Sequence, residues 1–273
     1  MSYRQLAFRF YWKMERSIVP GLRDSQYRYK EVLKSVVFPG AAWLDLGCGH
    51  QIFPTYMSSS EGEEHELVRG CRLAVGLDYS PEGLKKHRSL RNGAVGDIER
   101  LPFDEDTFDV VSANMVMEHI AHPRAAIAEV RRILRPGGIF LFHTINALNY
   151  TFLLAKSVPQ GIKNRLIWLL EGRKEEDIFP VFYRFNTARQ LQALLRDTGL
   201  ECQRMEFLNS TATTAQLGPV AIPELGLIRF LQRPWAEHYR SNIIGVLHKR
   251  HCDTLDRLHP GGHPSAAIHG HPE

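Results

Sequence analysis

The sequence predicts an α/β fold in which a mostly parallel sheet is covered by helices on both faces. Three observations support this prediction: apolar runs of strand length recur with helical segments between them, a glycine turn follows the first run, and several helices carry start and stop signals. This alternation is typical of parallel sheets because each crossover between parallel strands needs a long connection, usually a helix.

Five apolar runs of strand length are expected to form the first part of the sheet. They cover residues 42–46, 72–77, 93–95, 108–113 and 139–144. Two later segments, "GLECQRMEFL" at 199–208 and "NIIGVLHKR" at 242–250, also have the composition of strands, and the second follows a long insertion. The sequence therefore predicts seven strands.

Helix signals lie between these strands. Ser80-Pro81-Glu82 offers an N-cap, a proline in the first turn and an acid near the positive end of the helix dipole. In "HPRAAIAEVRRILRPGG", residues 122–138, apolar residues recur on one face, and Pro136-Gly137-Gly138 is expected to stop the helix. Thr187 and Gln190 form a capping box at the start of a further helix.

The composition is that of an ordinary globular protein. Of 273 residues, 44% are hydrophobic and 23% charged, which is enough for one substantial core. The net charge is +4, and the first 35 residues hold eight Lys or Arg against three Asp or Glu, so the remainder is almost balanced. Without a broad basic face, no nucleic-acid partner is expected. The sequence has no membrane-spanning run and no signal-peptide pattern, so a cytoplasmic location is expected.

The cysteines give no indication of a metal site. Cys48, Cys71, Cys202 and Cys252 are far apart and form no C-x-x-C pair, so reduced thiols are expected.

Several segments lie outside the alternating pattern. Residues 1–35 look helical and aromatic, and we expect them to form a lid over a core made of residues 36–145 and 183–250. Residues 146–182 and 209–240 are expected to be cap insertions. The tail 251–273, which is rich in Gly, Pro and His, is expected to be disordered.

The glycine turn lies in "WLDLGCGHQIFP", residues 43–54. A strand that ends in G-x-G, here Gly47 and Gly49, places backbone N–H groups and a helix N-terminus at the carboxyl edge of the sheet, where open α/β folds bind ligands. The apolar stretch after Gly49 is expected to start that helix. A dinucleotide fingerprint would need a third glycine where the chain has Ile52, which argues against NAD.

At these residues the sequence resembles the class I S-adenosylmethionine-dependent methyltransferases, in particular the branch that acts on small molecules and quinones. The first motif of that family is present as Asp45-Leu46-Gly47-Cys48-Gly49, although a further glycine frequent in the family is replaced by Gln51. Later motifs follow in order as "VGLDYS", "GDIERLPFDEDTFDVV", "FDVVSANMVMEHI" and "EVRRILRPGGIFLFHT". The resemblance covers residues 41–145 and resumes at 183–207 and 241–249.

The resemblance implies a Rossmann-like, seven-stranded sheet with an added helical cap and S-adenosylmethionine as cofactor. It assigns Asp78 to the two ribose hydroxyls, Asp97 to the adenine amino group and Ile98 to the face of the adenine ring. Asp45 would orient the glycine loop or the amino group of the cofactor. The other residues that it assigns to the cofactor site are Gly47, Cys48, Gly49, Tyr79, Asn114 and Met115. Taken alone, each aspartate at a strand end would be interpreted as a helix cap or turn former.

The expected reaction is transfer of a methyl group to a small, fairly apolar acceptor, at oxygen or else at carbon. His119 is the first candidate for a general base and His143 the second. A structural or cofactor-side role is the alternative for His119, and burial with backbone partners is the alternative for His143. Tyr183 and Arg184 are candidates to orient a substrate oxygen or carboxylate, or else they fasten the cap.

The cap insertions carry many apolar residues, and three explanations stay open. These residues could line a pocket for an aromatic, polyketide-like or prenylated acceptor, rest on a membrane surface, or pack against the core. The rival functions are methylation of RNA or protein and a non-catalytic scaffold of the same fold. The oligomeric state cannot be inferred from the sequence.

Overall fold

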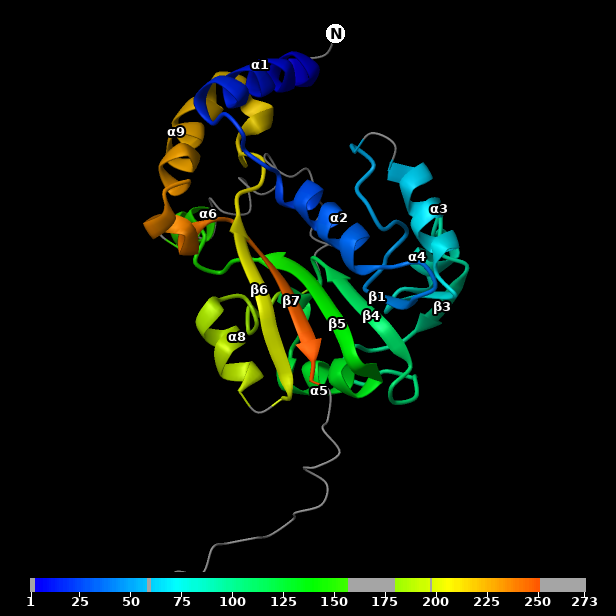
Figure 1. Cartoon of the computed structure of the whole chain (residues 1–273). Helices are drawn as coiled ribbons and strands as arrows, with labels where there is room; N and C mark the ends of the chain where they lie inside the picture. The colour runs from blue at the N-terminus through cyan, green and yellow to red at the C-terminus, as the bar shows by residue number, and fades with distance from the viewer. Residues whose placement is uncertain (1–2, 58–59, 157–179, 197, 251–273) are drawn as a thin grey trace, which may run out of the picture.

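A seven-stranded sheet forms the centre of the computed structural model, which describes residues 3–57, 60–156, 180–196 and 198–250 (Figure 1). Among these residues the strand order is β3-β2-β1-β4-β5-β7-β6, in which β1 to β5 are parallel and β7 is antiparallel to β5 and β6. The strands are β1 (Ala42–Leu46), β2 (Leu73–Asp78), β3 (Asn92–Val95), β4 (Phe108–Asn114), β5 (Leu134–Ile145), β6 (Leu200–Leu208) and β7 (Asn242–Lys249). The predicted α/β fold with a mostly parallel sheet is confirmed.

Helices cover both faces of the sheet and its carboxyl edge (Figure 1). The α-helices are α1 (Tyr3–Ile18), α2 (Ser25–Val36), α3 (Ser60–Gly70), α4 (Pro81–Lys85), α5 (Pro123–Ile133), α6 (Tyr150–Lys156), α8 (Ala188–Leu195) and α9 (Ala221–Leu231). Three 3₁₀ segments are η1 (Met117–His119), η3 (Ala215–Val220) and η4 (Pro234–Tyr239). The two predicted helix N-caps are present: Ser80 Oγ accepts from Gly83 N at 3.3 Å, and Thr187 Oγ1 accepts from Gln190 N at 3.2 Å.

Two local predictions are wrong. The strand β5 begins at Leu134, immediately after α5, so Pro136-Gly137-Gly138 lies inside the strand instead of stopping the helix. The pairing with β4 shifts register there, because Leu134 pairs with Phe108 whereas Ile139 pairs with Val110. The helix expected directly after the glycine turn does not form either, since residues 50–57 are non-helical and α3 begins at Ser60.

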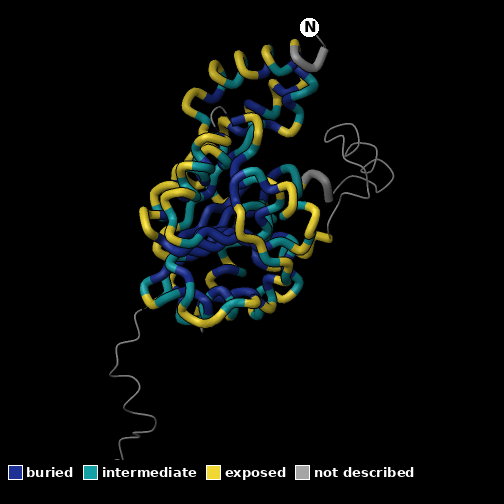
Figure 2. Tube along the Cα trace, turned by 90° about the vertical axis from the view of Figure 1, so that its right-hand side faces the viewer, coloured by how far each residue is buried: buried dark blue, intermediate teal, exposed yellow. Residues whose placement is uncertain are grey.

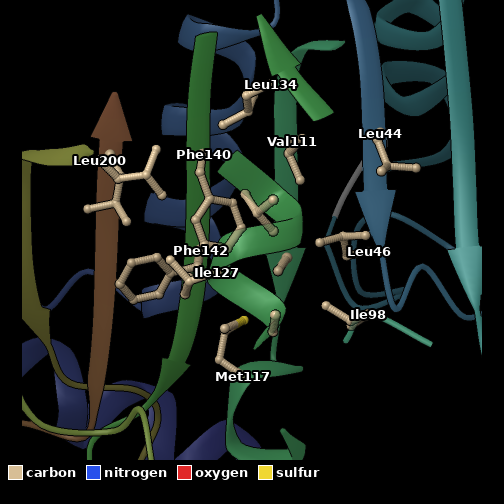
Figure 3. Packing of buried hydrophobic residues seen from close by; sticks show 14 of the residues in the cluster. Leu44, Leu46, Ile98, Val111, Met117, Ile127, Leu134, Phe140, Phe142 and Leu200 are labelled. Atoms are coloured by element: carbon tan, nitrogen blue, oxygen red, sulfur yellow. The ribbon is translucent and has the colours of Figure 1, made fainter. Parts of the chain in front are cut away.

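The sheet separates two hydrophobic clusters because successive side chains along a strand point to opposite faces. Figure 3 shows the first cluster, in which Leu44 and Leu46 of β1 and Phe140 and Phe142 of β5 lie near Ile127 of α5. The second cluster, on the other face, joins Trp43 of β1 and Leu141 of β5 to α2. Buried positions are concentrated in the sheet in Figure 2. Helix α2 is therefore part of the layer that covers the sheet.

The cap joins α1 to the helices that lie between β6 and β7. Helix α1 packs against η3 and α9 around a third cluster of buried side chains, and α1 and α9 lie beyond the carboxyl ends of the parallel strands (Figure 1). The buried hydroxyl of Tyr11 donates to Glu15 and accepts from Ala212 N at 2.9 Å. Tyr150 of α6 donates to Glu224 of α9 at 2.7 Å.

Much of the apolar surface of the second insertion is used within the cap. Leu225, Ile228 and Leu231 of α9 are buried, whereas Phe230 and Trp235 are exposed and contact each other edge to face, with ring centroids 5.1 Å apart. Residues 157–179 of the first insertion and the tail 251–273 lie outside the described residues. Within the described ranges, no helix has both the length and the apolar character needed to cross a bilayer.

We expect Gly245→Ala to lower the free energy of unfolding by about 1–3 kcal/mol, because overpacking of a core is destabilising. Gly245 of β7 pairs with Phe142 of β5, and a Cβ at this position would lie 2.3 Å from the Phe142 ring. Gly226→Ala is the matched control, since a Cβ there meets nothing within 4 Å and helix propensity favours alanine. Chemical denaturation of both variants tests this, and equal stabilities would contradict it.

Candidate functional site

The glycine turn after β1 is joined to the end of β2. Gly47 N and Cys48 N both donate to the carbonyl oxygen of Leu77, at 2.7 and 3.2 Å. Gly47 and Gly49 have φ angles of 62° and 54°, a region that favours glycine. A Cβ on Gly47 would lie 2.4 Å from Cγ2 of Val116, whereas a Cβ on Gly49 would meet no atom within 4 Å. Gly47 is therefore required for packing, and Gly49 faces open space.

Asp78, at the end of β2, ties this turn to the next one. Its Oδ2 accepts from Gly49 N at 2.8 Å, and its Oδ1 accepts from Ser80 N at 2.8 Å. Each carboxylate oxygen can accept about two hydrogen bonds, so both retain capacity for a ligand. The side chain is half-buried at the carboxyl edge of the sheet.

The third predicted acid follows β3 at the same edge. Gly96 N donates to the carbonyl oxygen of Asp78 at 3.2 Å, which holds the ends of β2 and β3 together. Asp97 is exposed, and its Oδ1 accepts from Glu99 N at 2.9 Å. Ile98 is buried and packs in the first hydrophobic cluster (Figure 3), so little of its surface can contact a ligand. Tyr79 is exposed.

Asp45 lies beneath the glycine turn in a fully buried environment. Ser112 Oγ donates to Asp45 Oδ1 at 2.5 Å and accepts from Trp43 Nε1 at 2.8 Å. Burial raises the pKa of Asp45 to about 7. The hydrogen bond from Ser112 lowers this pKa, whereas the negative charges of Glu64 and Asp78 raise it. The carboxylate would therefore gain from a cation placed beside it.

A second buried acid, Glu64 of α3, fixes the non-helical segment that follows the turn. It accepts from Phe53 N at 2.7 Å, Ser89 Oγ at 2.9 Å and Arg88 Nε at 2.8 Å. The Cys48 thiol is also buried and points at Gly76, where a Cβ would lie 2.6 Å from Sγ. Only the backbone of Cys48 thus belongs to the edge of the turn.

Asn114, Met115 and His143 meet at the ends of β4 and β5. Asn114 Nδ2 donates to Oε1 of Gln26 in α2 at 3.0 Å, and Asn114 Oδ1 lies 2.8 Å from Nδ1 of His143. Met115 has a φ of 58° and donates its N–H to the carbonyl oxygen of His143 at 2.8 Å. His143 is fully buried and stacks on Tyr29, and burial lowers its pKa to about 3.

A cavity of about 1060 Å³ lies beside this group, between α1, α2 and the ends of β4 and β5. Its lining includes Met115 and His143. It also includes the aromatic side chains Phe8 and Trp12 of α1, Tyr27 of α2 and Tyr56.

The remaining candidates lie together elsewhere, around η1. His119 Nδ1 is 2.9 Å from the carbonyl oxygen of Pro180. Tyr183 N donates to the carbonyl oxygen of Glu118 at 3.3 Å, and Arg184 Nη1 donates to that of Ala121 at 2.7 Å. His119, Tyr183 and Arg184 are not among the residues that line the cavity. These contacts fasten the segment after residue 180 to η1.

Sequence reasoning missed Gln26, Ser112 and Glu64. Each acts through a contact between distant segments, and no periodicity or cap signal marks such a residue in the sequence. Among the described residues, no group of three or more His, Cys, Asp or Glu side chains could hold a metal ion.

Comparison with known proteins matches residues 44–142 to a family described as a methyltransferase domain. An uncharacterized 37.1 kDa protein of transposon TN4556 from Streptomyces fradiae is 32% identical over 123 residues, which cover 42% of this chain and 34% of that protein. The ubiquinone biosynthesis O-methyltransferase of Hahella chejuensis is 29% identical over 176 residues, which cover 59% of this chain and 69% of that protein.

The solved structure of a geranyl diphosphate methyltransferase in complex with SAM has the same fold, with a TM-score of 0.50 and 16% identity over 82% of this chain and 85% of that one. The first two curated relatives are matched over only about a third of their own length, 34% and 36%.

We expect Asp45→Asn to stabilise the ligand-free protein, and to do so more at high pH. The folded state keeps Asp45 protonated up to about pH 7, whereas the unfolded chain ionises it near the ordinary pKa of an aspartate, 3.8, so wild-type stability falls as the pH rises through this window. Asparagine removes that loss and can still accept from Ser112.

The advantage of Asp45→Asn over the wild type should therefore grow by about 2–3 kcal/mol between about pH 5 and pH 8. Denaturant unfolding at both pH values measures it, with the exposed Asp104→Asn as control. An advantage that is constant or shrinks with pH would show that Asp45 is ionised in the folded state.

Proposed function

We propose that the chain, through the methyltransferase domain matched at residues 44–142, is a class I S-adenosylmethionine-dependent methyltransferase that transfers a methyl group from S-adenosylmethionine to a small, fairly apolar acceptor. The observation that carries this proposal is the bond from Gly49 N to Asp78 Oδ2 at 2.8 Å. It joins the open glycine turn and a carboxylate at one edge of the sheet, where one ligand can contact both.

The residues at this edge fit the proposed cofactor. The open space beside Gly49 leaves room for the part of the cofactor that would contact the backbone of the glycine turn. Asp78 can accept hydrogen bonds from the two ribose hydroxyls. Asp97, on the neighbouring strand end, would accept from the adenine amino group. A cationic amino group near Asp45 would favour the ionised carboxylate, which burial otherwise disfavours.

When bound, S-adenosylmethionine supplies a methyl group that is already activated on a sulfonium. The task of the chain is then to align the acceptor with that methyl group, which can contribute roughly 7–11 kcal/mol to lowering the barrier. Oxygen is the proposed methylated atom, with carbon as the alternative. The cavity beside Met115 supports a small acceptor because four aromatic side chains, Phe8, Trp12, Tyr27 and Tyr56, contribute to its lining.

Of the two histidines, we favour His143 as the one near the acceptor. It borders the cavity, whereas His119 lies beside Pro180 outside the lining. Tyr183 and Arg184 also lie outside that lining, and we assign them to fastening the cap.

Asp78→Ala should weaken binding of S-adenosylhomocysteine by about 100-fold or more, because hydrogen bonds to a charged group contribute about 1.5–3 kcal/mol each. Isothermal titration calorimetry of the full chain measures this. Asp104→Ala, which removes an exposed aspartate from a distant turn, should bind like the wild type. Undiminished affinity of Asp78→Ala would remove the ribose assignment, and no binding by the wild type would overturn the proposed function.

His119→Ala should keep turnover within about tenfold of the wild type and leave the affinity for S-adenosylhomocysteine unchanged. A general base contributes about 10²–10⁴-fold, so a loss of that size at constant cofactor affinity would restore His119 as the base. Turnover is measured with a labelled methyl donor and an acceptor found by screening.

A further inference from the structure

The cavity wall comes mostly from outside the matched methyltransferase domain. Of the lining residues, only Tyr56 and Met115 lie within residues 44–142. The rest come from α1, α2, the segment after β6 and the starts or ends of neighbouring strands. The cavity is therefore a feature of this chain's own flanking segments, and it can select a ligand that the shared domain does not specify.

Aromatic rings around this cavity are unusually exposed to solvent. The side chains of Trp12, Tyr27 and Tyr56 are 40%, 44% and 64% exposed, and the rings of Tyr27 and Tyr56 lie 6.5 Å apart. Exposed aromatic surface grouped around one hollow indicates a binding site for apolar or planar ligands, because their binding removes this surface from water.

The charged groups of the lining already have partners within the chain. Arg28 donates to both carboxylate oxygens of Glu206 at 2.8 Å and to Glu31 at 2.9 Å. Asp24 accepts from Gln26 N, Thr211 N and Thr211 Oγ1, and Glu15 accepts from Tyr11. Arg23, the remaining charged group of the lining, lies 3.7 Å from Glu31. Because the charged side chains of the lining are already paired in this way, the lining favours a neutral ligand.

One of the lining residues, His143, has a buried ring nitrogen with no hydrogen-bond partner. Because Asn114 Nδ2 donates to Gln26, the oxygen of Asn114 faces Nδ1 of His143, which must then carry the ring proton. This leaves Nε2 of His143 as an unpartnered lone pair, fully buried. The opposite tautomer would bury an unpaired N–H, a much rarer arrangement.

We propose that this cavity is the acceptor site, that it takes a neutral aromatic molecule between Trp12, Tyr27 and Tyr56, and that a hydroxyl or N–H of that molecule donates to Nε2 of His143. The proposal rests on the proposed function above. Because Nε2 is buried, the proposal includes a rotamer change of Met115, a flexible side chain of the lining whose N–H donates to the carbonyl oxygen of His143. Burial keeps the His143 imidazole neutral. Its Nε2 therefore positions the substrate by accepting a hydrogen bond from it, and the ring does not take up a second proton.

Three naphthalene probes test the chemistry of the cavity in calorimetric titrations of the full chain saturated with S-adenosylhomocysteine. 2-Naphthol is neutral and carries a donor, 2-methoxynaphthalene is neutral without a donor, and 2-naphthoate is an anion near pH 7. We expect 2-naphthol to bind about tenfold more tightly than the methoxy compound, as one hydrogen bond provides, and 2-naphthoate to bind more weakly than either. Preference for the anion, or equal binding of all three, overturns the proposal.

Variants locate the probe. Trp12→Ala should weaken 2-naphthol about tenfold, whereas Trp235→Ala, which removes an exposed tryptophan far from the cavity lining, should not. His143→Phe should abolish the preference for 2-naphthol over 2-methoxynaphthalene. Nitrogen-15 NMR of the wild-type imidazole gives a readout that does not depend on the folding of that variant, and a proton on Nε2 instead of Nδ1 would contradict the assignment.

Failure of this proposal and failure of the proposed function give different results. If the wild type does not bind S-adenosylhomocysteine, the proposed function fails. If S-adenosylhomocysteine binds and Trp12→Ala leaves both that affinity and 2-naphthol binding unchanged, only the acceptor site proposed here is overturned.

Discussion

The parallel order of the first five strands is the constraint on which the rest of the molecule depends. It brings the carboxyl ends of β1, β2 and β3 to one edge, and the Asp78 carboxylate then joins the turns that follow β1 and β2. Without that order, Gly49 and Asp78 would have no reason to meet, being 29 positions apart. The same edge continues through β4 and β5 to Asn114 and His143, so the residues proposed to hold the cofactor and those proposed to contact the acceptor lie at one edge.

Buried acids beneath the glycine turn give this edge a defined electrostatic character. Asp45 and Glu64 lie inside the protein, but their surroundings differ. Glu64 is compensated by Arg88, whereas Asp45 receives a neutral hydrogen bond from Ser112. An uncompensated carboxylate under an open turn costs stability and becomes favourable only when a positive group arrives. If the proposed cofactor places its amino group beside Asp45, the stability that the buried carboxyl costs the ligand-free fold would be recovered as binding energy.

Features set by neighbouring residues could be predicted from the sequence. The run at 42–46 became β1, and Ser80 and Thr187 cap helices as expected, because short-range periodicity and capping decide such elements. The prediction of a helix directly after Gly49 is wrong because contacts with a later segment determine the path of the chain there. Phe53 is buried, and its N–H donates to Glu64 of α3. Gln26 and the cavity depend on how α2 packs on the sheet, which local patterns do not encode.

The hydrogen bond between Tyr11 and Ala212 spans 201 positions of the chain. The contact of α1 with the segment after β6 can therefore form only after residue 212 has been synthesised, although β1 to β5 are synthesised earlier. During that interval the apolar face of α1 has no intramolecular cover. Hydrophobic surface that stays uncovered during synthesis favours nonspecific contacts, so this late pairing makes α1 an exposed apolar segment of the nascent chain.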